Sequence, residues 1–243
     1  MLEVRNLRAG YQNLEVLHGV DLKVPSGRTV ALLGANGAGK TTLLNAIAGL
    51  VPATAGDVLV DGRSVLADRV HLRARDGICL VPEGRGIFRH LTVRKNIAMF
   101  LRGGDLGAAL DRVEGWFPRL TQRLEQVAGT LSGGEQQMLA VCRALLLDAR
   151  IVMADELSVG LAPVVVDEIF EAVETLRAEG RSLLIVEQYA DRVLGVADYV
   201  YILHKGAIEF VGEPAQLADG SLFHRYLGSS SEVPLSETAG GRR

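Results

Sequence analysis

The sequence predicts an α/β fold with a mainly parallel sheet, and two features of the chain lead to that prediction. Short apolar segments with strand character, such as 151–154 and 182–187, alternate with a segment of helical periodicity at 165–179. Strands and helices that alternate in this way are typical of parallel sheets with crossover helices. From about residue 84 to 131, apolar residues recur instead at helical spacing, so we expect a small helical lobe inserted in the core.

The individual elements follow from local patterns. The N-terminal part alternates apolar and polar residues, which favours strands, and Pro25–Gly27 predicts a turn. In chain order the expected strands are 2–7, 16–24, 29–33, 58–60, 77–81, 151–154, 182–187, 199–204 and 207–211, and the expected helices are 41–50, 134–147 and 165–179. Asp61-Gly62 and Lys205-Gly206 predict hairpin turns.

The polar tail limits the expected domain. Residues 229–243 contain few large apolar side chains, so we expect them to be disordered. The predicted domain therefore spans 1–228, with the helical lobe at about 84–135.

Composition narrows the class of protein. The 243 residues are 48% hydrophobic, which suffices for one sizeable core with a small attached lobe. The 26 basic and 29 acidic residues give a net charge of −3, so nucleic acid is not expected as a partner. Two distant cysteines form neither a zinc pattern nor a disulfide framework, which favours a reducing, cytoplasmic setting. No apolar run approaches the roughly 18 residues of a membrane span.

A glycine-rich segment lies between the expected strand 29–33 and the helix after it. It reads GANGAGKT from Gly34 to Thr41 and matches the pattern G-x-x-x-x-G-K-[ST]. Glycines let successive N–H groups face phosphate oxygens, and the following helix adds its positive N-terminal end. Lys40 is expected to reach the β- and γ-phosphates, and Thr41 to bind Mg²⁺. A chance match has a probability on the order of one per cent, so the segment predicts an ATP-phosphate site.

A second segment ends an apolar strand with two acids. Ile151–Ala154 is followed by Asp155 and Glu156. Asp155 suits a Mg²⁺ site through water, and Glu156 is expected on the other side of the strand end, where it can act as general base toward water. Taken alone, an apolar run followed by two acids more often indicates a strand that leads into a solvated loop than a catalytic site.

A third segment, Leu131–Gln137, reads LSGGEQQ. Ser132 and Glu135 have the spacing of a capping box, which is the structural interpretation. The hydroxyl, the two glycines and the helix N-terminus also form a second phosphate cradle. One nucleotide does not need two cradles, so we expect a dimer in which each second cradle closes over the other subunit's ATP.

These three segments together resemble ATP-binding cassette (ABC) ATPases, in matching order along roughly residues 2–228. The resemblance implies a P-loop NTPase fold: a RecA-like core with a mainly parallel sheet, an N-terminal antiparallel β lobe and the inserted helical lobe. It implies catalytic roles for Glu156, Lys40 and Gln188, and metal binding by Thr41, Asp155 and Glu83. The implied ATP-binding residues are Tyr11, Gly34, Ala35, Asn36, Gly37, Ala38, Gly39, Lys40, Thr41, Thr42, Glu83, Ser132, Gly133, Gly134 and Glu135. Tyr11 would stack on adenine; the alternative is an ordinary strand aromatic.

The chain departs from the common ABC pattern in several places. Glu83 stands where the metal-sensing glutamine is usual, Gln188 stands where a γ-phosphate histidine is usual, and Ala162 replaces an aspartate. The set VPEGR, LSGGEQQML, SxGLAP and VEQ is similar to LivF-type subunits of branched-chain amino-acid uptake systems. Leu157 replaces a proline even there, which frees a backbone N–H and is expected to loosen the turn beside Glu156.

This resemblance implies the energising subunit of an importer at the inner face of the cell membrane. Expected partners are a second ABC ATPase, of which a paralogue is favoured, in a head-to-tail dimer, two integral membrane permeases and, indirectly, a solute-binding protein. The permease surface is expected near 83–96, with Phe88, Leu91 and Ile97 in the groove or in the core of the lobe.

Several alternatives stay open. The relatives include ATPases of urea or amide importers, and a non-transport ABC ATPase is a further possibility. A P-loop kinase or GTP switch would leave LSGGEQQ unexplained, and a binding module without catalysis is disfavoured by Glu156 and Lys40.

Overall fold

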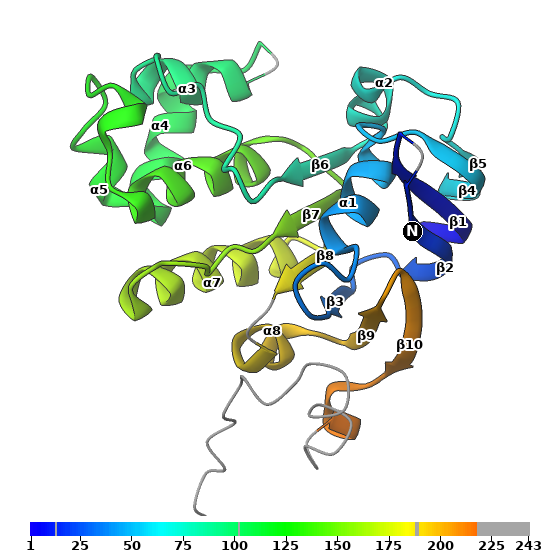
Figure 1. Ribbon diagram of the computed structural model, residues 1–243. Coiled ribbons are helices and arrows are strands. Elements are labelled where there is room, and N and C mark those ends of the chain that lie inside the picture. The colour runs from blue at the N-terminus through cyan, green and yellow to red at the C-terminus, as the bar shows by residue number, and fades with distance from the viewer. Residues whose placement is uncertain (13, 102, 188–189, 218–243) are drawn as a thin grey trace, which may run out of the picture.

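The computed structural model describes residues 1–217 except 13, 102, 188 and 189. Two sheets and their helices make up this part of the chain (Figure 1). The expected tail 229–243, the domain end at 228 and Gln188 lie outside the described residues.

The first sheet is antiparallel and has the strand order β2-β1-β4-β5. Its strands are β1 (Leu2–Tyr11), β2 (Leu14–Val24), β4 (Ala53–Val60) and β5 (Arg63–Ser64). Asp61 and Gly62 join β4 to β5 with positive φ angles of 49° and 81°, as a tight hairpin turn requires. This sheet is the N-terminal antiparallel β lobe.

The second sheet is mainly parallel and has the order β10-β9-β3-β8-β7-β6. Its strands are β3 (Thr29–Leu33), β6 (Ile78–Val81), β7 (Ile151–Asp155), β8 (Ser182–Glu187), β9 (Tyr199–His204) and β10 (Ala207–Gly212). Only the edge strand β10 pairs antiparallel within the described sheet. All residues of β3, β7 and β8 are buried, which explains their continuous apolar runs.

Helices cover both faces of the second sheet (Figure 1). They are α1 (Lys40–Ala48), α2 (Val70–Arg75), α3 (Val93–Phe100), α4 (Leu106–Trp116), α5 (Pro118–Thr121), α6 (Gly133–Leu146), α7 (Pro163–Ala178) and α8 (Ala190–Val196), with short 3₁₀ turns η1 (Ala128–Thr130) and η2 (Pro214–Leu217). Among the described residues no helix is both long and apolar enough to cross a membrane.

The alternation of each buried strand divides the interior into two cores. In β7, Ile151 and Met153 face α1 and the antiparallel sheet, whereas Val152 and Ala154 face α6, α7 and the helical lobe. In α3, Val93, Ile97 and Phe100 share one face because their spacing follows the helical period, and all three are buried. Ile97 is fully buried, so of its two expected places, the permease groove or the core of the helical lobe, the structure supports the core.

The structure confirms most of the expected elements but adds two helices. The short α2 and α8 lack a sustained apolar period, so no local pattern predicts them. The strand expected at 58–60 begins already at Ala53. Its first residues are small or polar and mostly exposed, and their strand geometry comes from pairing with β1.

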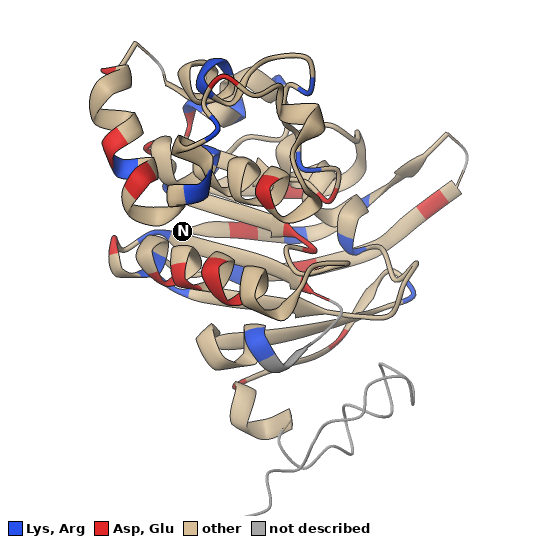
Figure 2. Cartoon of the chain, turned by 90° about the vertical axis from the view of Figure 1, so that its left-hand side faces the viewer, with Lys and Arg blue, Asp and Glu red and all other residues tan. Residues whose placement is uncertain are grey.

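Charged residues are spread over the helical lobe and the core. Basic and acidic residues are interspersed along the helices that Figure 2 shows. Two ion pairs tie the helical lobe to α7: Arg119–Glu168 at 3.0 Å and Arg112–Glu179 at 3.7 Å. Each of these exposed pairs contributes little to the free energy of unfolding, but together they join the helical lobe to the core at two separate points.

Candidate functional site

The glycine-rich loop connects the end of β3 to the start of α1. Gly37 and Gly39 have φ angles of 80° and 107°, which favour glycine. A Cβ atom on Gly34 would lie 2.4 Å from the carbonyl oxygen of Leu203, so only glycine fits there. Gly39 supplies no side chain to cap α1, so the first N–H groups of this helix are open to an anion.

Lys40 lies under this loop and is 5% exposed. Its ammonium group donates to the carbonyl oxygens of Gly34 at 2.8 Å and Ala35 at 3.2 Å. Burial lowers the pKa of Lys40, and the nearby carboxylates of Glu156 and Asp155 oppose that shift. The cation is therefore held beside the loop by two backbone carbonyl oxygens.

Asp155 ends β7 and is 2% exposed. One carboxyl oxygen, Oδ1, is buried without a hydrogen-bond partner, and the Thr41 hydroxyl hydrogen-bonds the carboxyl group. Burial raises the pKa of Asp155 to about 6, and the Thr41 contact opposes that shift. An unpaired buried carboxylate oxygen beside a hydroxyl fits the oxygen ligands that Mg²⁺ prefers.

Glu156 follows directly, and its carboxylate lies 3.8 Å from the Lys40 ammonium group. The two acids were expected on opposite sides of the strand end; instead Asp155 faces Thr41 and Glu156 faces Lys40, two neighbours in one loop. The φ angle of Glu156 is 51°, which is rare for a residue with a side chain. This left-handed residue breaks the alternation of the strand and turns the second carboxylate back toward the loop.

We expect Asp155→Asn to raise the melting temperature of the nucleotide-free chain near neutral pH. The pKa of Asp155 rises from 3.8 to about 6 on folding, so the stability contributed by this group falls as the pH increases through about 4 to 6. The shift corresponds to at most about 3 kcal/mol. Thermal unfolding at about pH 4.5 and pH 7.5 tests this expectation, and the gain should be larger at pH 7.5. A variant that melts below the wild type at both values would contradict it.

Ser132 caps α6 with a full capping box. Its hydroxyl accepts from the Glu135 N–H at 3.3 Å, and its own N–H donates to the Glu135 carboxylate at 2.9 Å. Arg123 pairs with the same carboxylate at 2.9 Å. A Cβ atom on Gly134 would lie 2.8 Å from Val165, so glycine is required there by packing. The capping interpretation of Ser132 and Glu135 is thus confirmed, and their phosphate role stays a prediction.

The segment after β6 carries Glu83, which is exposed. Its charge acts on both Lys40 and Asp155, so it lies within electrostatic reach of the loop. The neighbouring Arg85, at a φ angle of 65°, donates to Gln136 in α6 at 2.6 Å. Sequence reasoning missed Arg85, because no local signal shows that its side chain reaches a residue 51 positions away.

Glu187, the last residue of β8, is fully buried. Its carboxylate accepts hydrogen bonds from Ser158, from the hydroxyl at 2.8 Å and from the N–H at 3.2 Å. Burial raises the pKa of Glu187 to about 7, and the Ser158 contacts oppose that shift. Sequence reasoning missed this residue as well, although the signal was the one that identified Asp155: an acid that closes an apolar strand.

The turn after Glu156 is held more firmly than the sequence indicated. Leu157 is 2% exposed and belongs to the core beside α6 and α7, and its N–H hydrogen-bonds the Glu187 carboxylate. The expectation of a loosened turn is therefore wrong, because the N–H that a proline would lack has a buried acceptor. Tyr11 ends β1 with 49% exposure, and its contact with adenine stays a prediction.

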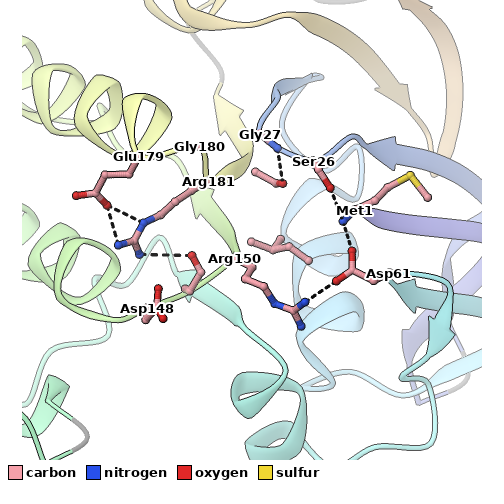
Figure 3. A pocket seen from close by; sticks show the side chains of 12 residues that line it. Met1, Ser26, Gly27, Asp61, Asp148, Arg150, Glu179, Gly180 and Arg181 are labelled. Atoms are coloured by element: carbon pink, nitrogen blue, oxygen red, sulfur yellow. Dashed lines mark hydrogen bonds and ion pairs between the residues drawn. The ribbon is translucent and has the colours of Figure 1, made fainter.

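A polar hollow and an apolar groove lie away from this loop. The polar hollow of about 400 Å³ is bounded by residues at the starts of β7 and β8 (Figure 3), and ion pairs along it include Arg150 with Asp61 and Arg181 with Glu179. An apolar groove, which we call the α2 groove, lies between α2, β6 and the C-terminal half of α6. Its lining residues include Leu50, Val70, Leu80, Pro82 and Leu147.

Comparison with known proteins agrees with this arrangement. The family model of the ABC transporter matches residues 17–159. The chain is 43% identical to the high-affinity branched-chain amino acid transport ATP-binding protein BraG of Pseudomonas aeruginosa, over 86% of this chain and 91% of that protein. It is 34% identical to the probable branched-chain amino acid transport ATP-binding protein LivF of Archaeoglobus fulgidus, over 93% and 97%.

Solved structures show the same fold. The ATP-binding subunit of an ABC transporter superposes with a TM-score of 0.80 at 27% identity, covering 95% of each chain. The family match covers more than half of the chain, and both curated relatives are matched over nearly their whole length. The chain therefore belongs to the ABC transporter family and is one of its ATPases.

Proposed function

We propose that this ATPase energises an importer of branched-chain or other hydrophobic amino acids. The observation that carries the proposal is the 43% identity to BraG, over 91% of that protein. Similarity along nearly the whole chain includes the helical lobe, which in this proposal faces the permeases. A transporter of urea or amides is the alternative for the solute.

In the proposed reaction, Lys40 and the N–H groups at the start of α1 hold the β- and γ-phosphates of ATP. Glu156 accepts a proton from the attacking water, and Gln188 donates a hydrogen bond to the γ-phosphate. Thr41, Asp155 and Glu83 would hold Mg²⁺, which would neutralise charge on the phosphate oxygens. The 3.8 Å between Lys40 and Glu156 supports this assignment, because a cation and a carboxylate lie together at one loop.

The second half of each site is proposed to come from a partner cassette. Ser132, Gly133 and Gly134 begin α6 with a hydroxyl and a helix N-terminus, the groups that bind an anion. In a head-to-tail dimer each α6 start would cover the ATP on the other subunit. The partner is either a second copy of this chain or, as we favour, a paralogue. The assembly would sit at the inner face of the membrane, with two permeases and a solute-binding protein.

The α2 groove is the surface that we propose for the permease. It lies directly before the Glu83 segment and has an apolar lining with two solvent-exposed side chains at its edge, Leu50 at 57% and Val70 at 41%. Such a groove fits an apolar helix from a membrane subunit. Phe88, at 47% exposure, lies in the segment that the sequence indicated and would extend this surface.

We expect Leu50→Asp to abolish permease binding, with more than about a tenfold loss of co-purified membrane subunits. A carboxylate buried in an apolar contact has no partner, whereas at this exposed position the isolated chain tolerates it. The measurement is affinity purification from detergent extracts of cells that express the chain with its permeases. Leu14→Asp is the matched control, since Leu14 is 69% exposed on β2 outside the groove. Equal co-purification of both variants would contradict the assignment of the groove.

Uptake of labelled leucine tests the proposed function. Cells that lack this chain should lose uptake of branched-chain amino acids and keep uptake of urea and of acetamide, and the intact gene should restore it. If the cells lose only the uptake of urea or of acetamide, the transported solute is urea or an amide and not a branched-chain amino acid. If no uptake changes and the chain co-purifies with no membrane subunit, the importer role is wrong.

A further inference from the structure

The geometry points to Glu187 as a positioning residue for ATP hydrolysis: we infer that its buried carboxylate fixes the segment 156–158 and so sets the place of Glu156. The inference rests on the proposed function, because it takes Glu156 as the base. Glu187 itself touches neither phosphate nor water in this inference.

The backbone of Glu187 lies beside the phosphate loop. Glu187 pairs with Leu33 in the parallel ladder of β8 and β3, and Leu33 directly precedes Gly34. On its other side β8 pairs with β7, with Val186 opposite Asp155. The end of β8 therefore lies between two groups: the loop that is proposed to bind phosphate and the acids, Asp155 and Glu156, that are proposed to take part in hydrolysis.

The side chain of Glu187 reaches across to the turn that follows Glu156. It accepts the Ser158 hydroxyl at 2.8 Å and the Ser158 N–H at 3.2 Å, each on a different carboxylate oxygen, and the Leu157 N–H as well. One residue earlier, the Glu156 N–H donates to the Val186 carbonyl oxygen at 2.9 Å. Three consecutive N–H groups, those of residues 156, 157 and 158, thus bond to Val186 and Glu187.

These bonds act on a residue whose conformation needs support. The φ angle of Glu156 is 51°, and a residue with a side chain keeps such a conformation only where its surroundings determine it. The turn after Glu156 becomes exposed from Val159, at 41%, so its outer part gives the Glu156 backbone little support. Without the Glu187 carboxylate, segment 157–158 would keep its buried Leu157 side chain but lose three hydrogen bonds next to the base.

A fully buried acid is also unusual enough to need a role. Glu187 has no exposed surface and no ion pair among the described residues; its described hydrogen-bond donors come from residues 157 and 158. Burying a carboxyl group is unfavourable, so an apolar side chain would suit the core alone better at this position. The carboxylate oxygens are used instead to hold the turn that begins at the proposed base.

The test compares the kinetics of five variants of the full chain. In Glu187→Ala, kcat for ATP hydrolysis should fall at least tenfold while KM for ATP stays within about twofold, because the phosphate loop is intact. In Glu187→Gln, kcat should return to within about threefold of the wild type: the amide oxygen accepts the Ser158 N–H and the amide nitrogen donates to its hydroxyl. Ser158→Ala removes one of the three bonds and should lower kcat less than Glu187→Ala does.

Ser182→Ala is the matched structural control. Ser182 is also buried in β8 and also accepts a hydrogen bond, from Gly27 N–H at 3.1 Å, but at the opposite end of the strand. The melting temperature of Ser182→Ala should fall below that of the wild type, whereas its kcat for ATP hydrolysis should stay unchanged. If Glu187→Ala does not fold, the Ser158→Ala and Glu187→Gln variants test the inference. Ser158→Ala must then lower kcat without raising KM, and Glu187→Gln must keep kcat within about threefold of the wild type.

Three results would overturn the inference: a Glu187→Ala variant with more than half of the wild-type kcat, a rise in KM with kcat unchanged, or a Glu187→Gln variant as slow as Glu187→Ala. Glu156→Gln in the same assay distinguishes a failure of the Glu187 inference from a failure of the proposed function. If Glu156→Gln keeps turnover, the proposed base is wrong; if it is inactive while Glu187→Ala is normal, only the role of Glu187 is wrong.

Discussion

Replacing Glu156 by Gln is expected to lower the rate of ATP hydrolysis by at least about a hundredfold while ATP still binds. Gln has the same shape but cannot accept a proton from water. The carboxylate lies 3.8 Å from the Lys40 ammonium group, so its replacement also removes one negative charge beside the proposed phosphate site. ATP affinity should therefore stay equal or increase. Phosphate release and the binding of a fluorescent ATP analogue measure the two effects separately.

Glu209→Gln is the control for this variant. Glu209 is exposed on the edge strand β10, so the same chemical change there should leave both measurements at the wild-type value. A Glu156→Gln variant that hydrolyses ATP at near the wild-type rate would remove Glu156 from the role of base. A variant that loses binding as well would show that Glu156 holds the loop rather than the water.

Replacing Lys40 by Ala is expected to weaken ATP binding by at least about a hundredfold and to abolish hydrolysis. A cation at 5% exposure acts through a medium of low dielectric, where its attraction to phosphate is stronger than in water. Lys40 donates to the carbonyl oxygens of Gly34 and Ala35 and lies near Glu156, so its removal leaves the loop without the charge that balances the acids.

Two further variants sharpen the Lys40 test. Lys95→Ala removes an equal charge from an exposed position on α3 and should bind ATP as the wild type does. Lys40→Arg keeps the charge but replaces a compact ammonium group by a planar fork, so partial binding without turnover would show that geometry matters beside charge. Unchanged ATP affinity in Lys40→Ala would argue against phosphate binding at this loop. Circular dichroism of each variant confirms that it folds.

Local patterns predicted much of the architecture. The apolar runs of β3, β7 and β8 are continuous because both faces of a parallel sheet are buried, and their boundaries were nearly correct from the sequence. The hairpin at Asp61-Gly62 followed from turn chemistry. By contrast, the first half of β4 and the short α2 have no such pattern, because their conformation depends on neighbouring elements.

Interactions between distant residues were the part that local patterns could not predict. Ile97 is as apolar as the exposed Phe88 in the same segment, so the sequence does not reveal its burial. Only the packing of α3 shows that Ile97 belongs to the core. The loosened turn at Leu157 was wrong for the same reason: the acceptor of its N–H lies on another strand, 30 positions along the chain.

By itself, the sequence determined the glycine-rich loop, the acids at the end of β7 and the capping segment of α6, because each depends on residue types at fixed local spacing. The tertiary structure decided which groups meet. It placed Glu156 rather than Asp155 next to Lys40, left Asp155 Oδ1 without a partner, and brought Glu187 onto Ser158. The physical reason is that parallel strands far apart in sequence end at one edge of the sheet, so their terminal side chains interact across distances that no local pattern records.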